Sequence, residues 1–279
     1  MIKLTLNAPA KINIGLNIVS KRSDGFHNLE TFFYPIYDLY DTIIFEQSNH
    51  FIFDTNNKEL NRDPDNLITK AHTIIEKYAN KKLPIKITLI KNIPIGAGLG
   101  GGSSDAAATL LGLNEFFELE IGLNKLNEFA LKLGSDVPFF IKSKPAVGYS
   151  RGEILSQSNV YITKPILIVN PGIHISTKEA FNSIMPKDSD FNYEYFSTND
   201  SIDFTFLQNE IRNDFEKYVF KYYPEIKLIK DIMIESKCLF SLMSGTGSTV
   251  YGIFDNLESA ESAAEKLPST YFRHISNLS

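Results

Sequence analysis

The chain has 279 residues and a formal net charge of −5, and 43% of its residues are hydrophobic, as in ordinary globular proteins. The acidic balance without a run of Lys and Arg argues against a nucleic-acid-binding surface, and no apolar run reaches the roughly 18 residues of a membrane-spanning helix. The one cysteine, Cys238, excludes a disulfide framework or a cysteine metal cluster, so we expect a cytoplasmic protein in which this thiol is buried.

The first half of the chain alternates between two hydrophobic periods. A period of two predicts strands at residues 2–7 and 85–90. Apolar residues every three or four positions, or runs of Ala and Leu, predict helices at 67–78, 106–117 and 123–133. We expect Asp65 or Asn66 to cap the first of these helices and Gly134 to end the last.

The second half has a recognisable order of elements. Strands are predicted at 165–169, 238–243, 249–254 and 270–275, and helices from about 176, from Pro224 and over 257–267. The polar stretch 186–203 has no period and predicts a surface loop. Strand, helix, strand, strand, helix, strand is the order of a ferredoxin-like unit. We therefore predict an α+β protein with two domains, residues 1–155 and 156–279.

A glycine-rich segment, PIGAGLGGGSSDAA at 94–107, directly precedes a predicted helix. Glycines that open a helix leave backbone N–H groups free beside the positive end of the helix dipole, which makes an anion site. The predicted phosphate-binding residues are Pro94, Gly96, Gly98, Leu99, Gly100, Gly101, Gly102, Ser103 and Ser104. Asp105 follows them, and two roles are open: capping the first helical turn, or holding a metal ion with the nucleotide.

The Walker and Rossmann phosphate-binding patterns fit these glycines less well. The Walker pattern requires a lysine after the glycines, and this chain has none there. Gly96, Gly98 and Gly101 match the Rossmann spacing, but that pattern leaves Gly100 and Gly102 without a role. A flexible linker would not normally run straight into a strong helix former.

The same segment resembles the second signature of the GHMP small-molecule kinases. APAKIN at 8–13 resembles the first signature of that family, and MSGTGST at 243–249 the third. Further segments resemble the branch that phosphorylates the 2-hydroxyl of 4-diphosphocytidyl-2-C-methyl-D-erythritol in non-mevalonate isoprenoid synthesis: RSDGFHNLET at 22–31, GSDVPFF at 134–140, RGE at 151–153 and NDFE at 213–216. The resemblance implies an N-terminal domain like ribosomal protein S5 domain 2, a ferredoxin-like C-terminal domain, and ATP bound over the glycine loop.

The resemblance also implies catalytic roles. Asp136 would be the general base that takes the proton of the substrate hydroxyl, although a helix cap would explain the same residue. Lys11 would pair with Asp136 and support charge on the reacting oxygen, the alternative being an exposed surface lysine. Asn13 would hydrogen-bond the substrate.

A cytidine site is implied by a second group of residues. His27 would hydrogen-bond the cytosine ring, with Phe26, where many members carry Tyr, as one of the aromatics beside it. Phe181 would cover the other face of the ring, although its spacing also suits a core residue. Thr177, Gly245 and Thr246 are predicted to contact the substrate, a plain hairpin being the alternative for the glycine turn.

Asn66 resembles the asparagine that faces the adenine of ATP, though a helix cap has the same appearance. Mg²⁺ is expected with ATP because it neutralises phosphate oxygens, with Ser104 and Asp105 as candidates and no firmly assigned protein ligand. Two rival functions stay open: another GHMP kinase acting on homoserine, mevalonate or a sugar, and a non-catalytic RNA-binding module. We expect a monomer or weak homodimer with a small-molecule substrate and neither nucleic acid nor membrane as partner.

Overall fold

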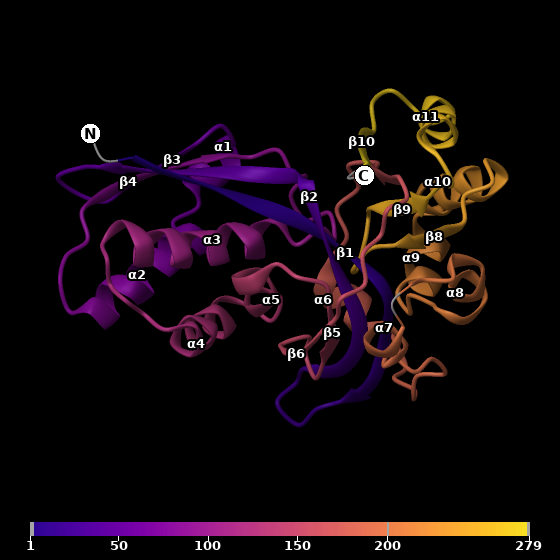
Figure 1. Ribbon diagram of the computed structural model, residues 1–279, viewed down its shortest axis with the longest axis horizontal. Helices are drawn as coiled ribbons and strands as arrows, with labels where there is room; N and C mark the ends of the chain where they lie inside the picture. Colours follow the sequence, from indigo (N-terminus) through magenta and orange to yellow (C-terminus); the bar gives the residue numbers. More distant parts are fainter. Residues whose placement is uncertain (1–2, 200, 278–279) are drawn as a thin grey trace. The chain divides into compact units, whose positions relative to one another are not determined.

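The computed structural model describes residues 3–199 and 201–277, which form two compact units (Figure 1). The first unit consists of the described residues up to Ala10, Leu39–Ile95 and Gly100–Ser143, and the second of Lys11–Asp38, Gly96–Leu99 and the described residues from Lys144. Neither unit is one continuous stretch, because the long strands β1 (Lys3–Lys21) and β2 (His27–Gln47) contribute residues to both. The predicted division between residues 155 and 156 stays a prediction.

In the first unit, β1 and β2 share a sheet with β3 (Ile52–Thr55) and β4 (Ile85–Ile90). Strand β4 runs antiparallel to β2, with Thr42 opposite Ile90, and parallel to β3. The strand predicted at 85–90 is confirmed. The first predicted strand is also confirmed from Lys3, although Ile2 lies outside the described residues, and it continues to Lys21 rather than ending at residue 7.

Five helices of the first unit are described: α1 (Lys58–Arg62), α2 (Leu67–Ala79), α3 (Gly101–Phe116), α4 (Leu123–Leu133) and α5 (Val137–Lys142). The helices predicted at 67–78 and 123–133 are confirmed, and Gly134 ends the second. Helix α3 begins at Gly101, five residues before the predicted start, within the glycine segment. It is buried along much of its length, and at Gly112 an added Cβ would lie 2.2 Å from the Phe45 ring, so only glycine fits.

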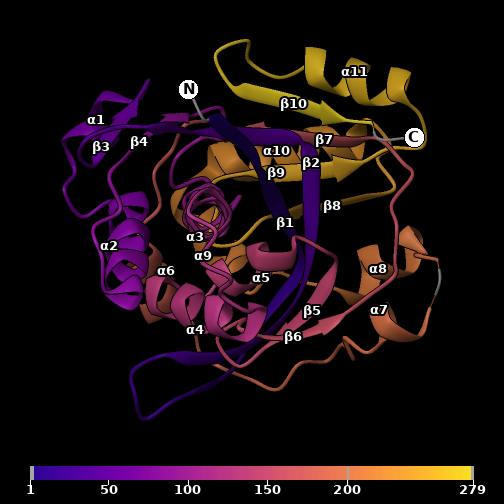
Figure 2. The same cartoon turned by 60° about the vertical axis from the view of Figure 1, so that its left-hand side comes forward.

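The second unit contains a four-stranded antiparallel sheet in the order β10-β7-β9-β8 (Figure 2). Its strands are β7 (Ile166–Asn170), β8 (Phe240–Met243), β9 (Val250–Ile253) and β10 (Phe272–Ser276). Helices α10 (Pro224–Glu235) and α11 (Leu257–Glu265) pack against it. They bury the residues that the helical period predicted, among them Ile226, Ile229, Met233 and Ala260. The ferredoxin-like order and the mixed α+β class are confirmed.

The remaining elements of the second unit are short. Strands β5 (Ala146–Tyr149) and β6 (Ile154–Gln157) extend the sheet of β2, with Thr31 opposite Gly148. The helices are α6 (Thr177–Asn182), α7 (Tyr195–Thr198), α8 (Phe204–Glu210) and α9 (Glu216–Tyr222).

The prediction of a simple surface loop at 186–203 is wrong over its middle part. Helix α7 lies within it, and Phe191, Tyr193 and Phe196 are buried. The Phe196 ring stacks on Phe32 with 4.0 Å between centroids, and the Tyr193 hydroxyl donates to Asn17. Aromatic burial anchors this segment although the residues around it are polar. Residue 200 lies outside the described residues.

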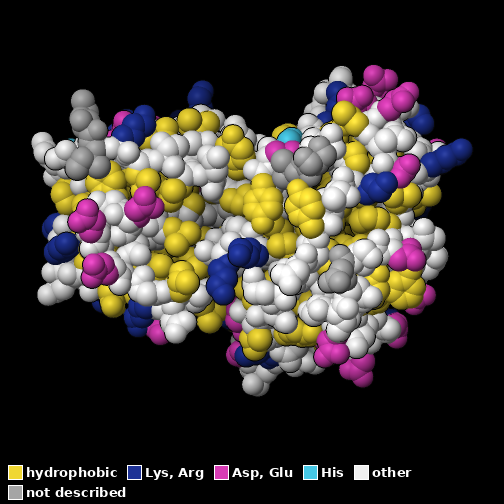
Figure 3. Space-filling view, in the orientation of Figure 1, with side chains coloured by type: hydrophobic (Ala, Val, Ile, Leu, Met, Phe, Trp, Pro, Cys, Tyr) yellow, Lys and Arg dark blue, Asp and Glu magenta, His cyan; other side chains and the backbone are white. Residues whose placement is uncertain are grey.

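The surface charges and the helix lengths are those of an ordinary globular protein, as the composition predicts. On the face that Figure 3 shows, Lys and Arg side chains lie at separate places with Asp and Glu side chains between them. Across residues 3–199 and 201–277, every helix falls short of the length and apolarity needed to cross a membrane.

Cys238 provides a test of the packing in the second unit. The side chain is partly buried against the core under α10, and this burial raises the pKa of its thiol to about 11. Because the thiolate is the reactive form, a disulfide reagent at pH 8 should modify the native protein more than about 100-fold slower than the chain unfolded in guanidinium chloride. The absorbance of the thiolate released by the reagent measures both rates. Equal rates in the native and unfolded states would contradict this packing.

Candidate active site

Helix α3 presents an uncapped N-terminus. Its N-cap residue, Gly100, has φ of 71° in the left-handed region, and no side chain of the described chain caps the helix. The Ser104 N–H is the first to bond back, donating to the Gly100 carbonyl at 2.9 Å. A helix of 16 residues that starts in this way offers donors and a positive dipole end to an anion. This end of the helix is therefore open to an anion, and phosphate binding by the predicted residues stays a prediction.

A buried ion-pair cluster of Lys91, Asp41 and Asp105 supports this helix end. Lys91 bridges the two carboxylates, with 2.8 Å between its Nζ and Asp105 Oδ2, and the three side chains expose 7%, 0% and 5% of their surfaces. Asp41 Oδ1 also accepts the N–H groups of Asn92 and Ile93, at 2.6 and 2.9 Å. The cluster thus ties β2, the segment before the glycines and α3 together.

The charges of this cluster are unbalanced, with two carboxylates to one ammonium. Burial raises the pKa of Asp105 to about 7, against the attraction of Lys91. Burial alone would lower the pKa of Lys91, but Asp105 and Asp41 outweigh it and raise that pKa. The predicted role of Asp105 as a cap is wrong, because its carboxylate is held by Lys91 instead.

Two oxygens beside the cluster fit a cation. Ser104 Oγ and Asp105 Oδ1 are buried, and within the described part of the chain neither has a hydrogen-bond partner. Hydroxyl and carboxylate oxygens are ligands that Mg²⁺ prefers. Ser104 and Asp105 therefore suit the Mg²⁺ that accompanies a nucleoside triphosphate.

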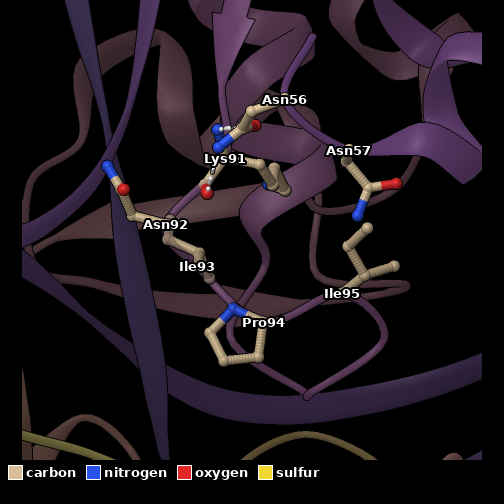
Figure 4. A pocket seen from close by; sticks show the side chains of 7 residues that line it. All are labelled: Asn56, Asn57, Lys91, Asn92, Ile93, Pro94 and Ile95. Atoms are coloured by element: carbon tan, nitrogen blue, oxygen red, sulfur yellow. Dashed lines mark hydrogen bonds between the residues drawn. The ribbon is translucent and has the colours of Figure 1, made fainter.

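A polar cavity of about 290 Å³ lies beside the segment that leads into the glycines (Figure 4). It is lined by Asn56, Asn57, Lys91, Asn92, Ile93, Pro94 and Ile95. The Asn56 amide is fixed by two bonds to the Lys91 backbone, accepting its N–H at 2.8 Å and donating to its carbonyl at 3.3 Å. The asparagine side chains at the cavity are thus held in place by backbone groups.

Asn66 is the N-cap of α2. Its side chain accepts the Thr69 N–H at 2.9 Å and donates to the Asp63 carbonyl at 2.7 Å. The seven residues that line the cavity do not include it. The capping alternative is therefore confirmed, and contact with adenine stays a prediction.

In the second unit, Lys11 is buried with only 3% of its surface exposed, so the alternative of a surface lysine is wrong. Its ammonium donates to Asn13 Oδ1 at 2.5 Å and to the Gly98 carbonyl at 3.1 Å, and it lies 5.7 Å from the Phe33 ring centroid. Asn13 Nδ2 in turn donates to Thr31. This polar cluster places an ammonium at the glycine turn.

Asp136 lies in the first unit at the N-cap position of α5. It occupies the capping position, but its carboxylate accepts no capping hydrogen bond from that helix. The pairing of Asp136 with Lys11 stays a prediction.

The glycine turn at 96–99 packs against the second glycine turn. Gly98 has φ of 78°, and an added Cβ would lie 2.2 Å from the Ser244 carbonyl oxygen, so both backbone shape and space require glycine. Ser244 Oγ donates to the Gly98 carbonyl at 2.8 Å, and the Thr249 N–H donates to the Ala97 carbonyl. The turn that contains Gly245 also joins β8 and β9, so the hairpin interpretation is confirmed, and contact with the substrate stays a prediction.

Several predicted substrate residues lie together in the second unit. The His27 and Phe181 rings stack with 5.1 Å between centroids, and Phe181 also packs edge-on against buried Phe215. Thr177 and Thr246 approach each other with 3.4 Å between hydroxyl oxygens. Burial, and then the charge of Lys21, lower the pKa of His27, which favours a neutral ring.

Phe181 therefore serves the core and faces His27 at once. The His27 ring now covers one face of Phe181, so a base that stacks on that face requires the two rings to part.

Sequence reasoning missed the Lys91 cluster and the asparagines of the cavity. Asp41, a carboxylate within a strand otherwise rich in apolar and aromatic residues, was the available signal for the first. Asn56 and Asn57 look like ordinary turn residues, and nothing local marks them.

The Lys91 cluster generates a stability prediction. Lys91→Met leaves two buried carboxylates without a counter-charge, so the free energy of unfolding should fall by about 3–5 kcal/mol in urea titrations. Lys86→Met, on β4 five residues earlier, is the matched control, because Lys86 pairs with Asp54 at 3.7 Å on the surface and should change stability by less than about 1 kcal/mol. Equal losses in the two variants would contradict the buried cluster.

Comparison with known proteins places the chain in a family. Residues 66–144 match the GHMP kinases N terminal domain and residues 202–273 match GHMP kinases C terminal. The 4-diphosphocytidyl-2-C-methyl-D-erythritol kinase of Bacteroides fragilis is 41% identical over 88% of this chain and 90% of its own. The enzyme of the same name from Chlorobium phaeobacteroides is 39% identical over 95% and 93%.

Comparison with solved structures also finds kinases of this family. A crystal structure of 4-(cytidine 5'-diphospho)-2C-methyl-D-erythritol kinase is 30% identical, with a TM-score of 0.80 and 98% of both chains covered. A homoserine kinase from Cytophaga hutchinsonii shares the fold at 16% identity, with a TM-score of 0.76 over 98% of this chain and 94% of its own. The chain belongs to the GHMP kinase family.

Proposed function

We propose that this chain is an ATP-dependent kinase that phosphorylates the 2-hydroxyl of 4-diphosphocytidyl-2-C-methyl-D-erythritol, giving the 2-phosphate and ADP. The observation that carries the proposal is the identity of 36–41% to curated enzymes of that name over 88–99% of the chain. A kinase acting on homoserine, mevalonate or a sugar would have no use for a cytidine site such as the one predicted at His27 and Phe181.

The nucleotide would bind along the glycine segment. The α3 N-terminus with Ser103 and Ser104 supplies donors for the phosphate oxygens, and the cavity at Asn56–Asn57 and Lys91–Ile95 suits the base. Ser104 and Asp105 would hold Mg²⁺, which supplies neutralising charge at the phosphate oxygens when bound. Preorganised donors of this kind stabilise the charge that spreads over the transferred group.

The transfer forms a bond between the 2-hydroxyl oxygen and the γ-phosphorus and breaks the bond to the leaving ADP. The hydroxyl proton goes to the Asp136 carboxylate. The Lys11 ammonium, fixed by Asn13 and the Gly98 carbonyl, supports negative charge on the reacting oxygens. Positioning by these groups supplies most of the catalysis, because phosphoryl transfer requires little covalent help from the protein.

The substrate would be held at its other end by aromatic side chains. Phe26 and Phe181 offer faces for cytosine, and the neutral ring of His27 offers a donor or acceptor to its polar edge. Gly245, Thr246 and Thr177 would contact the diphosphate. The substrate is thus recognised as a cytidine diphosphate that carries an alcohol.

Asp136→Asn tests the base. The variant cannot accept the hydroxyl proton, so kcat should fall by about 10² or more while the Kd of ATP stays nearly unchanged. ADP release with the cytidyl alcohol, with mevalonate and without an acceptor measures activity, and Asp255→Asn, at an exposed carboxylate, is the control. Ordinary turnover of Asp136→Asn would place the base elsewhere, and activity on mevalonate alone would refute the substrate.

A further inference from the structure

An exposed aromatic ring is held in place beside the predicted cytidine site. Phe26 follows the turn at residues 22–25 and exposes 49% of its surface. The guanidinium of Arg151 lies over this ring, with 4.3 Å between its central carbon and the ring centroid. Such a distance marks a cation–π contact. One group thus covers part of the ring while much of the ring stays accessible to a second flat group.

The backbone of Phe26 is fixed through the turn. Its N–H donates to Asp24 Oδ1 at 3.1 Å, and the same carboxylate accepts the Nε and Nη2 groups of Arg22. Arg22 Nη1 reaches across to Ser150 Oγ at 2.8 Å. The turn before Phe26 is therefore tied to the segment between β5 and β6.

The ring of Phe26 is fixed from that same segment. Ser150 Oγ donates to Glu153 Oε1 at 3.0 Å, and Glu153 Oε2 accepts the N–H of Arg151 at 2.6 Å. Arg151 Nε lies 3.8 Å from Glu153 Oε1, and its guanidinium returns to the Phe26 ring. The contacts form a closed chain of interactions, here called the circuit, through Asp24, Arg22, Ser150, Glu153 and Arg151. It begins at the backbone N–H of Phe26 and ends at the Phe26 ring.

We propose that Arg151 is a positioning residue for substrate specificity: it sets the orientation of the Phe26 ring so that a cytosine ring can stack on it. This inference rests on the proposed function. A freely rotating exposed ring would lose its rotamer freedom when the base binds, whereas a ring already held by Arg151 does not. Exposed ion pairs such as Arg22–Asp24 add little to folding stability, so the circuit acts mainly on binding.

The chain contains no tryptophan, so a single introduced indole reports on this position alone. In Phe26→Trp, Arg151 should hold the indole and keep its fluorescence anisotropy high. Adding Arg151→Gln should lower that anisotropy without any nucleotide present, while Arg273→Gln, at an exposed arginine on β10, leaves it unchanged. Equal anisotropy with and without Arg151 would overturn the positioning role.

Binding of cytidine diphosphate by calorimetry tests the consequence. In the otherwise unaltered chain, Arg151→Gln should raise the Kd by about 3- to 30-fold, the range that a cation–π contact supports. Arg151→Lys should retain most of the affinity, because an ammonium can also lie over the ring. In turnover assays Arg151→Gln should raise the KM of the cytidyl substrate and leave kcat and the KM of ATP unchanged.

The outcomes separate the two proposals. If the unaltered chain does not bind cytidine diphosphate, the proposed function fails, and the specificity role fails with it. If the unaltered chain binds it and Arg151→Gln binds equally well, only the role of Arg151 is overturned. Should Arg151→Gln not fold, Glu153→Gln removes the partner charge and should give an intermediate rise in Kd, and no rise would count against the circuit.

Discussion

Lys91 is buried between Asp41 and Asp105, and this ion-pair cluster fixes the start of the segment that carries the glycines. Asp41 binds the two N–H groups that follow Lys91, so the chain enters Pro94 in one conformation. Asp105 fixes the first turns of α3 from the other side. A phosphate site made of backbone donors works only if the backbone is rigid, and here the rigidity comes from charges outside the glycines themselves.

The regular elements of the second unit could be predicted because their signals are local. Helix α10 follows from the period of Ile226, Ile229 and Met233 behind Pro224, and each strand of the sheet is a short apolar run. The segment around Phe196 could not, because its burial depends on stacking with Phe32, which lies far away in sequence. The residues next to Phe196 in the sequence are mostly polar, so a prediction made from that local stretch of sequence gives a loop.

The candidate site also has parts that the sequence predicts from local signals and parts that it does not. The glycine segment is a local motif and the helix after it was predictable, although the start of that helix lies five residues earlier than predicted. The Lys91 cluster joins residues 41, 91 and 105, whose separation no periodicity detects. Asn66 illustrates a third case, in which one residue type suits two roles and only the hydrogen bonds decide. The circuit at Phe26 uses RGE at 151–153, where the arginine and the glutamate act together.

The strands β1 and β2 belong to both compact units, and this has a consequence for synthesis on the ribosome. The first unit is incomplete until its last helix, α5, has been made through residue 142, and the second awaits β10 at Phe272–Ser276. Asn13 is therefore translated more than 200 positions before Tyr251, whose hydroxyl donates to its carbonyl, so a half-made chain exposes surface that later residues cover. Such long-range pairing slows folding and makes the nascent protein a client for chaperones.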